Sequence, residues 1–64
     1  MTDTQPLVDI DSLATRLGVT VRWVRRQVAH RSIPFIKLGH LIRFDPDEIE
    51  QWLTAARVRP STDD

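Results

Sequence analysis

The four residues Leu-Gly-Val-Thr at positions 17–20 constrain the fold most, because they end one helix and begin the next. Before them, apolar residues recur at the helical spacing i, i+3, i+4, i+7, in Ile10, Leu13, Ala14 and Leu17. Gly18 suits the left-handed conformation that closes a helix, and Thr20 is a good N-cap for the following one. A helix, a short glycine turn and a second helix make the helix-turn-helix arrangement.

The three predicted helices share one start signal, an N-cap side chain flanked by a hydrophobic staple. Asp9 is the predicted N-cap of the first helix, and Thr20 has that place in the second. The third helix begins at Pro46, with Asp45 as its N-cap and Glu48 as the partner of a capping box. Its buried stripe follows at helical spacing, in Ile49, Trp52, Leu53 and Ala56.

The segment 33–44, between the second and third helices, predicts a β-hairpin. Two short apolar-rich runs flank Gly39 and His40, a pair that suits a tight two-residue turn. Apolar and basic residues alternate along the two runs, with Ile36, Leu38, Ile42 and Phe44 set against Lys37 and Arg43. We therefore expect a hairpin with one apolar face and one basic face.

Length limits the chain to one domain. A chain of 64 residues buries about 60% of its unfolded surface, and without cysteine no disulfide can brace it. The sequence predicts a mainly α fold with a small β-hairpin, namely a winged helix-turn-helix of three helices and a two-stranded wing. We expect residues 1–7 to be a disordered leader, 8–57 the folded domain and 58–64 a polar tail. The sequence shows neither a signal peptide nor a membrane span, so we expect a cytoplasmic protein.

The charges cancel over the whole chain but are separated along it. Residues 13–44 carry +7, from six arginines and Lys37, and contain no Asp or Glu. Residues 1–12 carry −3, and residues 45–64 carry −4. A small domain with a concentrated basic segment has a one-sided field, and the commonest partner of such a field is a polyanion. Arginine, at eight residues against one lysine, also favours forked binding of phosphate.

The second helix places these cations on one face. Val21, Val24 and Val28 share the inner face of that helix, and its arginines lie on or beside the opposite one. The major groove of B-DNA accepts one α-helix, and a basic hairpin beyond that helix can reach the backbone or the minor groove. We therefore predict that residues 8–57 bind double-stranded DNA. The candidate DNA-binding residues are Arg16, Thr20, Arg22, Trp23, Arg25, Arg26, Lys37, His40 and Arg43.

These candidates have different expected roles. Arg22, Arg25 and Arg26 are expected in or beside the major groove. Thr20, at the N-terminus of the second helix, is expected to bind a phosphate. For the Trp23 side chain two alternatives remain, namely half-buried packing and a contact with DNA. The DNA backbone is the expected contact of the remaining four, Arg16, Lys37, His40 and Arg43.

Other interpretations of these features have less support. The basic segment could be a solvated helix face or a helix on a membrane surface, but its apolar side is needed for the core. Trp52 and Phe44 are expected in the core, and Gln27 is expected to be structural. His30 and His40 are expected at the surface, because no further metal ligands cluster with them. Without tyrosine the chain cannot be a tyrosine recombinase, and it shows no Gly-rich phosphate loop and no paired-carboxylate pocket. We therefore expect no enzyme activity, cofactor, metal or small-molecule ligand.

Six motifs follow one another in a characteristic order, namely Leu17-Gly18-Val19-Thr20, Val24 with Val28, Ile33-Pro34, Lys37-Leu38-Gly39, Ile42-Arg43-Phe44 and Ile49-Glu50-Gln51-Trp52-Leu53. This order resembles the small excisionase-type winged helix-turn-helix proteins, which are related to the MerR DNA-binding head. The resemblance covers residues 8–53. The sequence differs from the family in two respects. MerR regulators continue into a long dimerising helix and an effector domain, and in this chain Trp23 replaces a small polar residue.

The resemblance implies sequence-specific DNA binding. Excisionases of this family are phage or mobile-element proteins that bend attachment-site DNA, often as several copies side by side, and steer an integrase toward excision. We therefore expect a monomeric excisionase whose partners are DNA, neighbouring copies of itself and an integrase. A small transcriptional regulator is the alternative. A third hypothesis is an adaptor whose basic face docks an acidic protein.

Overall fold

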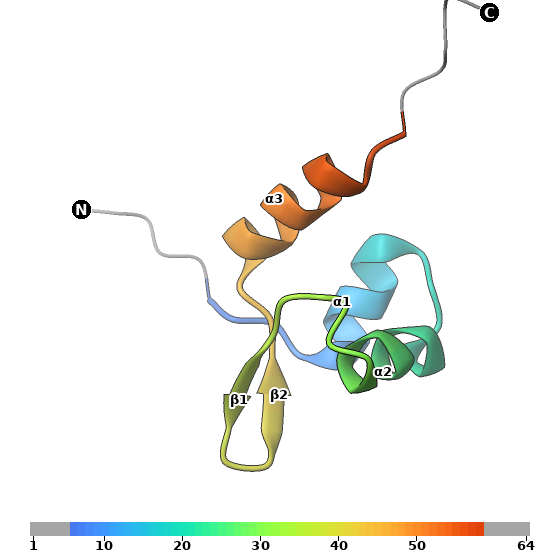
Figure 1. Cartoon of the computed structure of the whole chain (residues 1–64). Coiled ribbons are helices and arrows are strands. Elements are labelled where there is room, and N and C mark those ends of the chain that lie inside the picture. Colours follow the sequence, from blue (N-terminus) through green and yellow to red (C-terminus); the bar gives the residue numbers. More distant parts are fainter. Residues whose placement is uncertain (1–5, 59–64) are drawn as a thin grey trace, which may run out of the picture.

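The computed structural model describes residues 6–58, which form three helices and one two-stranded sheet (Figure 1). In chain order the elements are α1 (Ile10–Leu17), α2 (Val21–Ala29), β1 (Ile36–Leu38), β2 (Leu41–Arg43) and α3 (Pro46–Ala56). This architecture confirms the predicted winged helix-turn-helix. Most of the predicted leader and tail lies outside the described residues. Within the described part of the chain, no helix is long and apolar enough to cross a membrane.

The predicted N-caps are confirmed in all three helices. Asp9 accepts a hydrogen bond from the Ser12 backbone N–H, and Thr20 Oγ1 accepts one from the backbone N–H of Trp23. Asp45 accepts from the backbone N–H of Asp47, the second residue of α3, rather than from Glu48 as a capping box requires. Local side-chain chemistry therefore sets where each helix begins.

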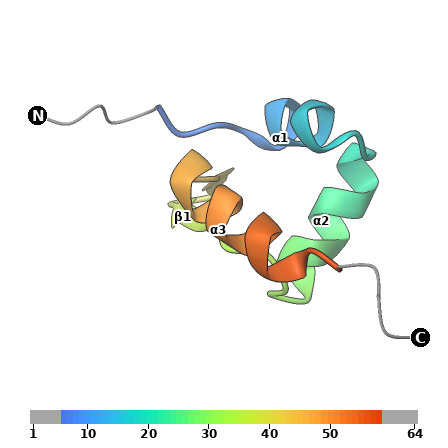
Figure 2. The same cartoon turned by 90° about the horizontal axis from the view of Figure 1, so that it is seen from above.

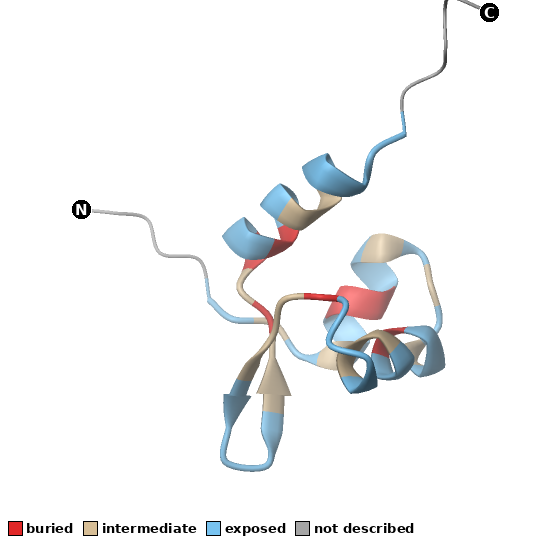
Figure 3. Ribbon diagram, in the orientation of Figure 1, coloured by how far each residue is buried: buried red, intermediate tan, exposed pale blue. Residues whose placement is uncertain are grey.

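The core lies where α1, α2, the loop before β1 and the start of α3 meet (Figure 3). Gly18, at φ +72°, ends α1 in the left-handed conformation, and the turn that follows sets α2 at an angle to α1 (Figure 2). This turn brings one face of each helix into the same core. The buried residues of this core cluster are Leu13, Ala14, Val24, Ile33, Phe44 and Ile49.

The two-residue turn of the hairpin is confirmed, but the predicted faces of the hairpin are wrong. Gly39 has a positive φ of +65°, whereas the φ of His40 is not positive. A positive φ at the first turn residue alone is typical of a type II′ turn. Paired residues share one face of a sheet, so Lys37 and Arg43 lie on opposite faces. The reason is parity, because a two-residue turn pairs an even position with an odd one. The cross-strand pairs are Ile36 with Arg43, Lys37 with Ile42, and Leu38 with Leu41.

A third extended segment pairs with the base of the hairpin. The Val8 N–H donates to the Phe44 carbonyl at 2.9 Å, and the Phe44 N–H donates to the Val8 carbonyl at 2.8 Å. The alternation along residues 33–44 placed Phe44 in the hairpin and gave no sign of a pairing with Val8. In Figure 1 the segment before α1 reaches the chain between β2 and α3 at this point. The wing is therefore tied at its base to the N-terminal side of the domain.

Two polar contacts hold α3 against the rest of the domain. Trp52 Nε1 donates to the Ser32 carbonyl at 3.0 Å, and Arg16 Nη2 donates to Glu50 Oε2 at 2.8 Å. The second contact is an ion pair between α1 and α3, and its exposure limits its contribution to about 1 kcal/mol or less. The burial of Ile49 supplies the apolar part of the attachment. The expectation that Trp52 belongs with the core is confirmed.

Asp9 makes the folded state sensitive to acid. The bond from the Ser12 backbone N–H first, then the Ser12 hydroxyl and more weakly the Arg43 charge, lower the pKa of the Asp9 carboxyl. A carboxyl whose pKa is lower in the folded state stabilises the fold above its unfolded pKa of about 4. This contribution is lost as the pH falls through the folded pKa.

The melting temperature of the wild type is therefore expected to fall more steeply below about pH 4 than that of Asp9→Asn. The asparagine side chain accepts the same capping bond but carries no charge, so it cancels the acid titration of this site alone. Thermal unfolding followed by circular dichroism at a series of pH values tests this. Melting curves of the two proteins that shift in parallel with pH would contradict the role of Asp9.

Candidate nucleic-acid interface

The outer face of α2 is an exposed cationic stripe. Arg22, Arg25, Arg26 and Ala29 follow one another at the spacing i, i+3, i+4, i+7, and all four are exposed. The opposite face of α2 is held by Val24, which has no exposed area. Burial of the valine side therefore orients the arginine side toward solvent.

These arginines are not neutralised within residues 6–58. The salt bridge in that part of the chain joins Arg16 to Glu50, and it leaves out the arginines of α2. Ala29 falls between Arg25 and Arg22 around the helix and ends the stripe at the C-terminus of α2, where its small side chain lets another molecule approach closely. Unpaired guanidinium groups around a small residue are suited to binding phosphate and base edges.

The N-terminal end of α2 carries two further candidates. The Thr20 side chain accepts a hydrogen bond from the Trp23 backbone N–H at 3.0 Å, so it caps the N-terminus of α2. This is the end of the helix at which a phosphate was expected. The Trp23 side chain is 36% exposed and does not belong to the core cluster. Its ring is thus available to a partner, and its DNA contact stays a prediction.

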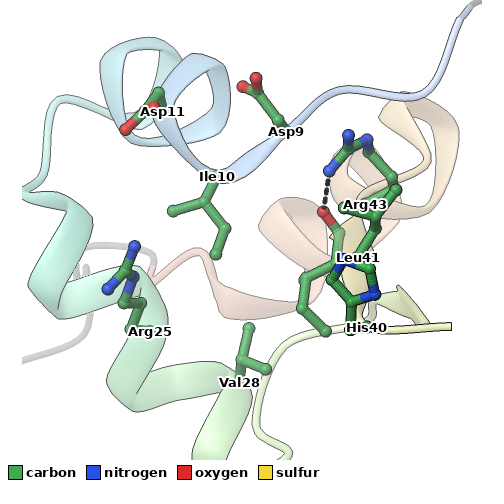
Figure 4. A pocket seen from close by; sticks show the side chains of 9 residues that line it. Asp9, Ile10, Asp11, Arg25, Val28, His40, Leu41 and Arg43 are labelled. Atoms are coloured by element: carbon green, nitrogen blue, oxygen red, sulfur yellow. Dashed lines mark hydrogen bonds between the residues drawn. The ribbon is translucent and has the colours of Figure 1, made fainter. Parts of the chain in front are cut away.

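The wing supplies cations of two kinds. Lys37 and His40 are exposed, one on β1 and one in the turn. Arg43 is half-buried, and its Nη1 donates to the carbonyl of Ile42 at 2.8 Å (Figure 4). Because Lys37 and Arg43 lie on opposite faces of the hairpin, one flat DNA surface cannot engage both in the same way.

A groove lies between the start of α1, α2 and the wing (Figure 4). Three of the predicted residues line it, because folding brings Arg25 of α2 together with His40 and Arg43 of the wing. Asp9 and Asp11 line the same groove. The sequence did not predict these two acids as part of the site, because the wing comes near them only in the tertiary structure. Their charges oppose an anion in the groove, so the outer face of α2 is the better site for phosphate.

Two other residues have structural partners. Arg16, predicted to bind the DNA backbone, is ion-paired with Glu50 of α3, and its contact with DNA stays a prediction. Gln27, expected to be structural, accepts a hydrogen bond at Oε1 from Ser32 Oγ at 2.6 Å. This contact confirms the expectation for Gln27 and fixes the turn that follows α2.

A helix-turn-helix with a cationic second helix, followed by a hairpin, defines a winged helix-turn-helix DNA-binding protein. The chain belongs to the helix-turn-helix domain family, whose model matches residues 7–57. The match includes all three helices and the wing. Searches of the curated proteins and of the solved structures find no significant match.

Proposed function

We propose that this protein binds double-stranded DNA sequence-specifically, with α2 in the major groove and the wing on the flanking backbone. The exposed arginines of α2 carry this proposal. A helix is about 10–12 Å across, which fits the major groove of about 12 Å and not the minor groove of about 6 Å. Arg22 and Arg26 can each bind the edge of a guanine through two hydrogen bonds. The protein acts by binding, and we assign it no catalytic step, cofactor, metal or small-molecule ligand.

Arg22→Ala and Arg26→Ala are each expected to weaken binding to the preferred sequence by about 1–3 kcal/mol. They are also expected to reduce the preference for that sequence over mixed-sequence DNA, because a base contact is lost. Lys37→Ala is expected to weaken binding to both DNAs alike, because a phosphate contact carries no sequence information. Selection of the preferred site from a random duplex library, followed by anisotropy titrations on both DNAs, measures these differences.

Arg57→Ala is the matched control, because it removes one positive charge from an exposed position after α3, outside α2 and the wing. Its affinity for both DNAs is expected to stay close to that of the wild type. Equal losses on the two DNAs for Arg22→Ala, Arg26→Ala and Lys37→Ala would show that α2 does not read the sequence.

We further propose that the protein is an excisionase, which binds attachment-site DNA as adjacent copies, bends it and directs an integrase toward excision. The order of its motifs supports this role, as does a family that includes excisionase-like small DNA-binding proteins. The charges are compatible with contact between copies, because the basic residues face DNA and leave exposed acids such as Asp47 and Glu48 of α3 to meet a neighbouring copy. A single module of this kind buries about 600–1,000 Å², so adjacent copies would add affinity that one copy lacks.

Sedimentation of the free protein is expected to show a monomer. Gel shifts are expected to show cooperative binding to DNA with several sites, and circular permutation is expected to detect a bend. A stable free dimer, or tight binding to one isolated site without a bend, would instead favour a small transcriptional regulator. An excision assay with a cognate integrase tests the role itself. Absence of a nuclease-protected footprint on duplex DNA would favour the adaptor for an acidic protein.

A further inference from the structure

Arg31, a cation outside the candidate set, has an unusual backbone conformation. Its φ is +55°, and within residues 6–58 it is the one non-glycine residue with a positive φ. A side chain with a Cβ atom rarely adopts this region, where glycine and asparagine are favoured. The residue lies in the turn directly after α2, on the path toward the wing (Figure 1).

The same motif ends α1 with glycine and α2 with arginine. At α1, Gly18 takes the left-handed position, with its N–H bonded to Thr15 and the Val19 N–H bonded to Ala14. At α2, Arg31 takes the corresponding position of this Schellman motif. Its two bonds run from the Arg31 N–H to the Val28 carbonyl, at 3.0 Å, and from the Ser32 N–H to the Gln27 carbonyl, at 2.9 Å. Glycine would fit the backbone at both places, and the chain has arginine at one of them.

Surrounding contacts hold the Arg31 backbone in this conformation. Ser32 Oγ donates to Gln27 Oε1 at 2.6 Å, which closes the turn a second time. The Ser32 carbonyl accepts from Trp52 Nε1 of α3 at 3.0 Å, so the turn is also fixed to the third helix. A left-handed non-glycine residue persists where its neighbours over-determine it, and such residues cluster at binding sites. The base of the Arg31 side chain is therefore held in a fixed place.

The Arg31 side chain is exposed, and within residues 6–58 it has no ion pair. It stands two residues after the end of α2, so it adds a cation directly after the arginines of that helix. We propose that Arg31 binds a phosphate of the DNA backbone next to α2. This inference rests on the proposed DNA-binding surface and adds to it a residue that lies between the helix and the wing. An arginine here supplies a charge that glycine cannot, and its fixed backbone reduces the ordering that binding requires.

The experiment compares Arg31→Gly, Arg31→Asn and Arg31→Lys with the wild type on a short mixed-sequence duplex, by anisotropy at several salt concentrations. Arg31→Gly and Arg31→Asn are expected to lower the affinity about fivefold at low salt and to reduce the steepness of the log–log salt dependence by about 0.9. Their melting temperatures are expected to stay unchanged or to rise, because both residues suit the left-handed backbone. Arg31→Lys is expected to keep nearly all of the affinity, because lysine also binds phosphate.

A structural role predicts a different set of results. A cation at the end of α2 can stabilise the helix dipole, and Arg31→Gly would then lower the melting temperature and leave the DNA affinity and salt slope unchanged. That result would overturn the proposal. Arg22→Ala, measured in the same way, distinguishes a failure of the Arg31 proposal from a failure of the proposed DNA-binding surface. A reduced slope for Arg22→Ala with an unchanged slope for Arg31→Gly refutes the role of Arg31 alone, and unchanged slopes for both refute the DNA-binding surface.

Discussion

Phe44→Ala is expected to leave most of the protein unfolded at room temperature. Phe44 has no exposed area and lies among the largest buried side chains of the core. Truncation of a buried phenylalanine to alanine lowers the free energy of unfolding by about 3–5 kcal/mol. A core of this size rarely supplies more than about 3–5 kcal/mol in total, so one such loss removes the whole margin.

The position of Phe44 makes relaxation around a cavity difficult. Its backbone forms two hydrogen bonds with that of Val8. The wing ends directly before Phe44, and α3 begins two residues after it. A collapse of the core at this point would therefore have to move the wing, α3 and the N-terminal segment together. We expect the full cost of the cavity rather than a partial one.

Thermal and urea unfolding, followed by circular dichroism, measure the loss. Leu38→Ala is the matched control, because it also truncates a large apolar side chain, but Leu38 is 50% exposed near the tip of the wing. The control is expected to melt close to the wild type. A cooperative transition for Phe44→Ala within about 1 kcal/mol of the wild type would show that Phe44 does not hold the core together.

The second large effect is expected in the salt dependence of DNA binding. A protein that neutralises about five phosphates has a log–log slope of about −4.5, so raising salt from about 50 to about 200 mM weakens binding about 500-fold. The expected size follows from the exposed cations of α2, the turn after α2 and the wing, namely Arg22, Arg25, Arg26, Arg31 and Lys37.

Anisotropy titrations on a mixed-sequence duplex over this range of salt give the slope. Arg22→Ala should make the slope shallower by about 0.9, because on mixed-sequence DNA, which lacks the preferred base, Arg22 meets a phosphate and that contact is lost. Arg57→Ala should leave the slope unchanged. An affinity that hardly depends on salt would show that the cationic face is not the surface that meets DNA.

The sequence by itself determined the elements and most of their boundaries. Asp9, Thr20 and Asp45 cap the helices where their side chains predicted, and Gly18 ends α1 in the left-handed conformation. The position of the hairpin turn at Gly39 was predicted correctly as well. These features were predictable because each depends on groups a few residues apart, whose geometry is set by the local backbone.

Only the tertiary structure decided how these elements meet. The pairing of Val8 with Phe44 and the ion pair of Arg16 with Glu50 join residues more than thirty positions apart. The wing places Lys37 and Arg43 on opposite faces, because the register and not the alternation along each strand sets which residues share a face. Contacts of this kind carry no local signal, since they follow from which apolar faces can be buried together. The outer face of α2 was predictable because its charge is local, whereas the groove beside it exists only where α1, α2 and the wing come together.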